Sequence, residues 1–323
     1  MHDAQATEAE RLMQSKFSIP GLAGGLILLA AIAGFHNWLF WLPNRQELGW
    51  HTARVEFTPV ALDARQIGPF QLVGAWKLTS NDPRFGGLSA LAIDRGRLLA
   101  LTDSGILIRF DRPGKRSGPA EIGELPDGPG SGSFKRNRDS EGLLADPAGR
   151  GWWVTFENRH SLWLFDRDFS RALWRLPLHQ YGWRPNLGVE GLAAKNGGLL
   201  LFPETGHSLL RVTGGRVRQM PIDHARGRIS DAAAVGPGQI LAIERRLTPL
   251  GFRNALVPIE RVGPGYRFGR RIALPVSPID NVEAIAVESL PGGKLRLWLL
   301  TDDNFQPPLR TLLIALDWSA SHQ

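Results

Sequence analysis

From residue 70 to the C-terminus, apolar residues come in short runs that are rich in β-branched and aromatic side chains. Gly, Pro, Asn and Asp separate these runs, which is typical of β-strands joined by turns. No long stretch of this region has the 3.6-residue period of an amphipathic helix. The pattern therefore predicts an all-β domain over residues 70–323.

The strand pattern repeats along the chain. Each repeat has an acidic or polar residue, a small residue, an apolar strand, a Gly/Asp turn, a second apolar strand that ends in a polar cluster, and a third strand. Five such units are visible, at residues 86–111, 139–166, 188–212, 230–262 and 282–317. Gly87, Gly142 and Gly191 are matched glycines of the first three units. A period of about 50 residues with several strands per unit indicates the blades of a β-propeller.

One unit of this kind cannot bury both of its faces, so neighbouring units must stack around an axis. The run 70–78 is a strand left over before the first unit, and it could close the ring by joining the C-terminal strands. We expect six blades, with five or seven as alternatives.

The N-terminal part of the chain differs sharply from the rest. Residues 17–42 contain no Asp, Glu, Lys or Arg. At about 1.5 Å per residue this segment can cross a ~30 Å hydrocarbon layer as a helix. Two outcomes stay open: a retained transmembrane anchor, favoured by the apolar run that continues to Leu42, or a signal peptide cleaved near Ala31-Ile32-Ala33.

Basic residues just before the apolar segment favour an orientation with the N-terminus in the cytoplasm. Residues 1–16 are then a cytoplasmic tail, and residues 43–69 are a linker to the propeller. The domain is expected on the periplasmic side of a bacterial inner membrane, held by residues 17–42, or free in the periplasm or medium if the segment is cleaved.

The composition of the chain restricts its possible partners and reactive groups. The formal net charge is +7 and the sequence pI is about 10.3, which favours anionic partners such as phosphate esters, acidic glycans or lipid headgroups. Scattered surface arginines that serve only solubility fit the charge equally well, and the export segment disfavours nucleic acid. The chain has no cysteine, which excludes disulfides, thiol nucleophiles and Cys-ligated zinc. The sequence does not determine the oligomeric state.

Acidic residues recur at two places in successive units. The start of the first strand carries Glu141, Glu190, Asp231 and Glu283, with Ser89 in the first unit. The end of the second strand is followed by Asp103, Glu157, Glu204, Glu244 and the pair Asp302-Asp303. Equivalent positions of a propeller form a ring at one mouth of the central channel, and Ca²⁺ takes about 6–8 oxygen ligands of this type. The alternative is that each acid forms a turn with its own backbone.

Basic residues stand beside several of these acids. They are Lys135, Arg136 and Arg138 before Glu141, Arg245 and Arg246 after Glu244, and Arg310 near the C-terminus. Arginine can bind a phosphate in a planar fork, or each arginine can simply pair with its neighbouring acid. His160 and His207 follow Glu157 and Glu204; a hydrogen-bonding role is favoured over acid–base chemistry. The chain has no G-x-S-x-G, H-E-x-x-H or P-loop motif.

Several short motifs, in order, resemble the bacterial phytase-like domain family, also called the "esterase-like activity of phytase" family. The matching pieces are residues 85–89 (FGGLS), 101–104 (LTDS), 138–143 (RDSEGL), 189–193 (VEGLA), 243–245 (IER), 280–285 (DNVEAI), 301–305 (TDDNF) and 310–313 (RTLL). The resemblance covers about residues 70–317. It implies an extracytoplasmic propeller with phosphoesterase or carboxylesterase activity, and it adds Asp303 to the candidate metal ligands.

We expect an ester hydrolase that uses a metal-activated water, with a non-enzymatic propeller that binds an anionic envelope component or a partner protein as the alternative. A lactonase is a third, weaker hypothesis. The candidate catalytic residues are Glu141, Glu190, Arg138 and Arg245. The candidate Ca²⁺ ligands are Glu141, Glu190, Glu283, Asp103, Asp302 and Asp303.

Overall fold

The computed structural model describes residues 49–114, 118–223 and 227–318. The described residues all belong to one compact unit of the chain. The expected cytoplasmic tail 1–16 and membrane segment 17–42 lie outside the described residues. Within the described ranges, no helix is both long enough and apolar enough to span a bilayer.

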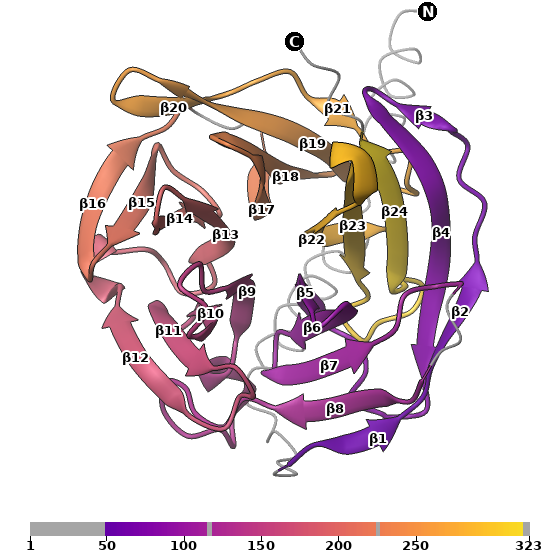
Figure 1. The fold of residues 1–323 in the computed structure, drawn as a ribbon, viewed down its shortest axis with the longest axis horizontal. Coiled ribbons are helices and arrows are strands. Elements are labelled where there is room, and N and C mark those ends of the chain that lie inside the picture. Colours follow the sequence, from indigo (N-terminus) through magenta and orange to yellow (C-terminus); the bar gives the residue numbers. More distant parts are fainter. Residues whose placement is uncertain (1–48, 115–117, 224–226, 319–323) are drawn as a thin grey trace, which may run out of the picture. The chain divides into compact units, whose positions relative to one another are not determined.

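The described residues form five antiparallel sheets, arranged as the blades of a propeller around one axis (Figure 1). Blade one contains β1 (His51–Ala53), β5 (Leu88–Asp94), β6 (Arg97–Thr102), β7 (Ile106–Phe110) and β8 (Ala120–Glu124). Blade two contains β9 (Ser140–Ala145), β10 (Gly151–Phe156), β11 (Ser161–Asp166) and β12 (Ala172–Pro177). Blade three contains β13 (Val189–Lys195), β14 (Gly198–Pro203), β15 (Ser208–Thr213) and β16 (Arg216–Pro221).

The last two blades carry additional strands. Blade four contains β17 (Arg228–Gly236), β18 (Gln239–Thr248), β19 (Gly251–Val262), β20 (Gly265–Phe268) and β21 (Ile272–Ala273). Blade five contains β22 (Asn281–Ser289), β23 (Leu295–Asp302), β24 (Leu312–Trp318), β2 (Val55–Pro59), β3 (Gln66–Ile67) and β4 (Phe70–Ser80).

The ring closes with five blades, so the expectation of six was wrong while the five-bladed alternative was right. The strand that begins at Phe70 does join the C-terminal strands, because β4 pairs with β24 from Phe70↔Trp318 to Lys77↔Leu312. It thereby completes the blade of the fifth repeat and adds no sixth one. This pairing of an N-terminal with a C-terminal strand fastens the two ends of the propeller domain.

The segment expected to be a linker, residues 43–69, also contributes strands. β1 pairs with β8 on the outer edge of blade one, and β2 and β3 pair with β4 in blade five. From His51 onward this segment is therefore part of the propeller. It reaches two neighbouring blades and covers edges that would otherwise present unpaired backbone groups.

The apolar residues of each strand are buried between blades, in clusters that join neighbouring sheets. One cluster joins blades five and one through Trp298 and Leu98, and another joins blades two and three through Leu162 and Leu201. Glycines of the innermost strands allow close approach: a Cβ at Gly142 would lie 2.9 Å from the Glu190 carbonyl oxygen. The E-G-L motif thus has a packing reason, and the five innermost strands contact one another in a closed ring around the axis.

Candidate functional site

The innermost strands all carry a β-bulge near one mouth of the channel. In blade two, Leu143 pairs with Val154 and Ser140 with Phe156, so Glu141 and Gly142 together face one residue. A bulge gives one strand an extra residue and redirects its side chain. The same irregularity occurs in the other four blades, and the five bulge residues are Ser89, Glu141, Glu190, Ser230 and Glu283.

A second set of residues lies next to the bulges, on or directly after the second strand of each blade. The backbone N–H of Glu157 donates to the Asp139 carbonyl (2.8 Å), and the N–H groups of Asp103 and Glu204 make the same bond in their blades. The strand registers place Arg245 and Asp302 at the equivalent points of blades four and five. The second set is thus Asp103, Glu157, Glu204, Arg245 and Asp302.

Blade four departs from the acidic pattern that the sequence suggested, because its two acids stand one residue away from the bulge position and the ring position. Asp231 takes the place that Gly191 has in blade three, where its buried carboxylate accepts hydrogen bonds from the N–H groups of Ala232 (2.7 Å) and Ile285 (2.9 Å). Glu244 is buried against the guanidinium of Arg271. Neither acid belongs to the mouth. Arg245 stands in the ring position itself.

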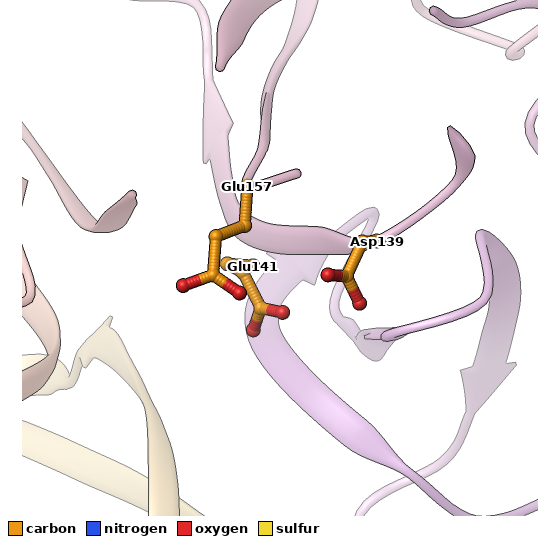
Figure 2. A group of neighbouring side chains, drawn as sticks. All are labelled: Asp139, Glu141 and Glu157. Carbon is orange, nitrogen blue, oxygen red and sulfur yellow. The ribbon is translucent and has the colours of Figure 1, made fainter. Parts of the chain in front are cut away.

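Two groups of carboxylates converge beside the axis, on blades two and three. Asp139, Glu141 and Glu157 form one group, and Figure 2 shows their carboxylates gathered together. Glu157, Glu190 and Glu204 form the other. In each group the nearest carboxylate oxygens all lie within 4.8 Å of one another, and Glu157 belongs to both.

Burial and mutual repulsion disturb the protonation of these acids. The pKa of Glu157 rises to about 7 because burial disfavours the anion; the Gly188 N–H bond opposes the rise and the charge of Glu204 adds to it. Burial first, and neighbouring carboxylates second, raise the pKa values of Glu141 and Glu190 well above the usual range. Ionisation of these carboxylic acids is energetically unfavourable unless a cation is bound close by.

The rest of the ring is largely neutralised by the chain's own cations. Arg245 binds Glu283 and lies 3.4 Å from Glu204, while Arg228 donates to the same Glu204 oxygen at 2.9 Å. Lys135 donates to Asp103 at 2.5 Å. The charges of Asp103, Asp139 and Glu141 raise the pKa of Lys135, against the opposing effect of burial, and keep it protonated. Glu204 is thus paired with two arginines. Among the described residues, the members of the two groups that form no salt bridge are Asp139, Glu141, Glu157 and Glu190.

Of the residues selected from the sequence, Glu141 and Glu190 lie in these groups. Asp103 and Asp302 lie in the adjacent part of the ring, where burial and the charge of Asp103 raise the pKa of Asp302 to about 7. Glu283 is occupied by Arg245 and by Asn281 (2.5 Å). The mouth is therefore acidic at Asp103 and Asp302, whereas Glu283 is already paired.

Asp303 and Arg138 have other contacts. Asp303 accepts hydrogen bonds from the N–H groups of Gly87 (3.0 Å) and Phe305 (3.1 Å), so it holds two loops together. Arg138 donates to the carbonyls of Pro129 (3.2 Å) and Asn137 (3.3 Å), and its charged neighbours are Asp127 and Glu124. The structure thus gives Arg138 a loop-holding position, which differs from the predicted catalytic one.

Sequence reasoning passed over three members of the two groups. Glu157 and Glu204 appeared in the recurring set but were not selected, and Asp139 was not considered. Their place in the repeat could have identified Glu157 and Glu204, since both occupy the same repeat position as Asp103 and Asp302. His160 contacts the Trp183 carbonyl (3.1 Å), and burial lowers its pKa, so it has the hydrogen-bonding role that was favoured.

The sheet order defines an all-β, five-bladed propeller whose axial mouth holds a carboxylate cluster. The chain belongs to the Phytase-like family, described as "esterase-like activity of phytase", whose model matches residues 83–305. That match includes every member of both carboxylate groups. No curated protein matches the chain.

Solved structures give weaker likenesses. The glutaminyl cyclase of Myxococcus xanthus is 15% identical, with 77% of this chain and 96% of that chain covered and a TM-score of 0.46. Hydrazine synthase of Kuenenia stuttgartiensis is 11% identical over 72% of this chain and 64% of that chain, with a TM-score of 0.40. These similarities carry no argument about function.

Proposed function

We propose that this protein is an extracytoplasmic, metal-dependent hydrolase of phosphate or carboxylic esters, with its site at the axial mouth. One observation carries the proposal: two carboxylate groups share Glu157, and of their five members only Glu204 forms a salt bridge among the described residues. Strongly perturbed acids that converge in one place are a mark of functional sites.

The donor set suits a hard cation such as Ca²⁺, because every candidate ligand is a carboxylate oxygen. Among the described residues, Glu204 Oε2 and Asp103 Oδ1 are buried without a hydrogen-bond partner. Asp139, Glu141 and Glu157 would hold one ion, and Glu157, Glu190 and Glu204 would hold it or a second one. A bound ion would polarise an ester oxygen and lower the pKa of a coordinated water.

The chain's own groups supply binding and proton transfer. Lys135, Arg228 and Arg245 surround the carboxylates and provide positive charge for an anionic ester. Arg228 is the most accessible of the three, with a side chain 55% exposed. A carboxyl group whose pKa lies near neutrality, such as Glu157, can exchange a proton at physiological pH.

The test measures Ca²⁺ binding by calorimetry, and hydrolysis of p-nitrophenyl phosphate and p-nitrophenyl acetate with and without chelator. Glu141→Gln together with Glu190→Gln should abolish chelator-sensitive turnover without unfolding the propeller. The control is Glu260→Gln, which changes an exposed acid paired with Arg267. Retained chelator-sensitive turnover in the double variant would rule this site out.

A non-enzymatic binding propeller is the second candidate, favoured by two arginines that already pair with its acids, Arg245 in the ring and Arg228 beside it. Ca²⁺ binding and retention of an anionic ligand, without turnover of either ester, would select this alternative. The periplasmic location and the attachment through residues 17–42 belong to the same proposal and rest on the sequence. Protease protection in spheroplasts tests them.

A further inference from the structure

The hairpin of β18 and β19 extends past the carboxylate ring. Arg245 is the ring member on β18, yet the two strands stay paired beyond it through Arg246↔Arg253, Leu247↔Phe252 and Thr248↔Gly251. At about 3.3 Å per residue, this extension is about 10 Å long. In blades one to three, the second strand ends next to the ring position. We call residues 246–253 the hairpin tip.

The hairpin tip is held in a defined conformation. The Phe252 N–H donates to the Pro278 carbonyl (2.7 Å), and the Thr248 hydroxyl donates to the Gly251 carbonyl (2.8 Å). Gly251 has a φ of +104°, and a Cβ there would lie 2.3 Å from the Pro278 oxygen. The loop that precedes β22 therefore braces the tip.

Apolar side chains are exposed on this element. Leu247 is 76% exposed and Leu250 is 73% exposed, the highest values among the large hydrophobic residues that the structure describes. Ile279 in the bracing loop and Phe305 in the β23–β24 loop, which follows Asp302, add exposed apolar surface at the same end of the propeller. Exposed leucines that share one tip indicate an interaction surface, whereas scattered ones do not.

The charges of the tip identify the chemistry of the partner. Arg246 lies directly opposite Arg253, and like charges at such a cross-strand pair repel. Among the described residues, neither arginine has an acidic partner. A tip that exposes leucines, with arginines behind them, suits the interface of an anionic bilayer. There the apolar side chains reach the acyl boundary and the arginines meet headgroup phosphates. The tip alone is small compared with the ~800 Å² that a stable protein interface buries on each partner.

We infer that the hairpin tip inserts into the surface of an anionic membrane and holds the axial site against the lipid headgroups. The substrate of the proposed hydrolase is then a phosphate ester carried at that surface. The choice of substrate rests on the proposed function. The membrane contact itself does not.

The absence of cysteine allows a clean test on the full-length chain in vesicles. Leu250→Cys is labelled with an environment-sensitive fluorophore, and Val262→Cys, 46% exposed at the opposite end of β19, is the matched control. In phosphatidylethanolamine–phosphatidylglycerol vesicles, spin-labelled lipid should quench the label at 250 several-fold more than the label at 262. Equal quenching at the two positions would overturn the membrane contact.

Charge and activity give two further readouts. Arg246→Glu with Arg253→Glu should reduce quenching at 250 to the control value, as should phosphatidylcholine vesicles; quenching that survives both would refute the role of the arginines.

Leu247→Ser with Leu250→Ser should leave hydrolysis of soluble p-nitrophenyl phosphate unchanged and slow that of phosphatidic acid in vesicles several-fold. Equal rates on vesicles would overturn the substrate assignment. Failure of all turnover with quenching retained would refute only the hydrolase.

Discussion

Replacing Glu157 by Gln should stabilise the metal-free protein above neutral pH, although it removes a candidate metal ligand. The Glu157 carboxyl is buried, and its pKa rises from 4.5 to about 7. A folded-state pKa above the unfolded value means that the native state holds a proton that the unfolded state has already lost. Wild-type stability is therefore full below about pH 4.5 and falls as the pH rises towards 7.

The magnitude follows from the shift. A difference of about 2.5 pKa units corresponds to about 3 kcal/mol, an upper value because neighbouring acids share the proton. Gln cannot ionise, and its side-chain oxygen can still accept the hydrogen bond that the Gly188 N–H now donates to Glu157 at 3.0 Å. The variant should therefore match the wild type near pH 4.5 and exceed it by up to about 3 kcal/mol at pH 8.

Urea denaturation of the chelator-treated full-length chain, followed by tryptophan fluorescence at several pH values, measures this difference. Adding Ca²⁺ at pH 8 should stabilise the wild type and have little effect on the variant, since a ligand stabilises the state that binds it. Glu260→Gln should behave as wild type throughout. A Glu157→Gln protein that is less stable than wild type at pH 8, or that has the same pH slope, would refute the raised pKa of Glu157.

Substitutions at three other positions probe the ring and the core. Trp298→Ala removes a fully buried side chain between blades and should cost about 3–5 kcal/mol in urea denaturation; a loss below 1 kcal/mol would contradict the packing. Asp231→Ala leaves the Ile285 N–H without an acceptor and should cost about 1–3 kcal/mol, whereas Asp231→Asn should cost much less. Arg245→Met frees Glu283 and should raise Ca²⁺ affinity in calorimetry while weakening retention of anionic esters; an unchanged affinity would show that Glu283 lies outside the metal site.

Much of the fold could be predicted from the chain alone. Alternating short apolar runs and turn residues indicate strands, and their repetition indicates blades, because one repeat cannot bury both of its faces. The blade number was harder to obtain. It depends on whether the strand from Phe70 starts a new blade or completes the last one, which is a question of pairing partners far apart in sequence.

The candidate site could be predicted only in outline. The repeated acids predicted a carboxylate-rich mouth, and Glu141 and Glu190 belong to the carboxylate groups that the structure brings together. The sequence could not show that Lys135 and Arg245 neutralise part of that mouth, because such pairing depends on distances between blades. It therefore could not identify Glu157 as the residue common to both carboxylate groups.

The sequence by itself determined the strand pattern, the repeat and the kind of side chain that each repeat offers. Tertiary structure decided which of those side chains face the axis. In blade four a shift of one residue brings Ser230 and Arg245 into the ring and moves Asp231 and Glu244 out of it. The physical reason is that strand side chains alternate in direction, so a single-residue change of register or a bulge reverses where a side chain points, and only the pairing of the strands fixes that register.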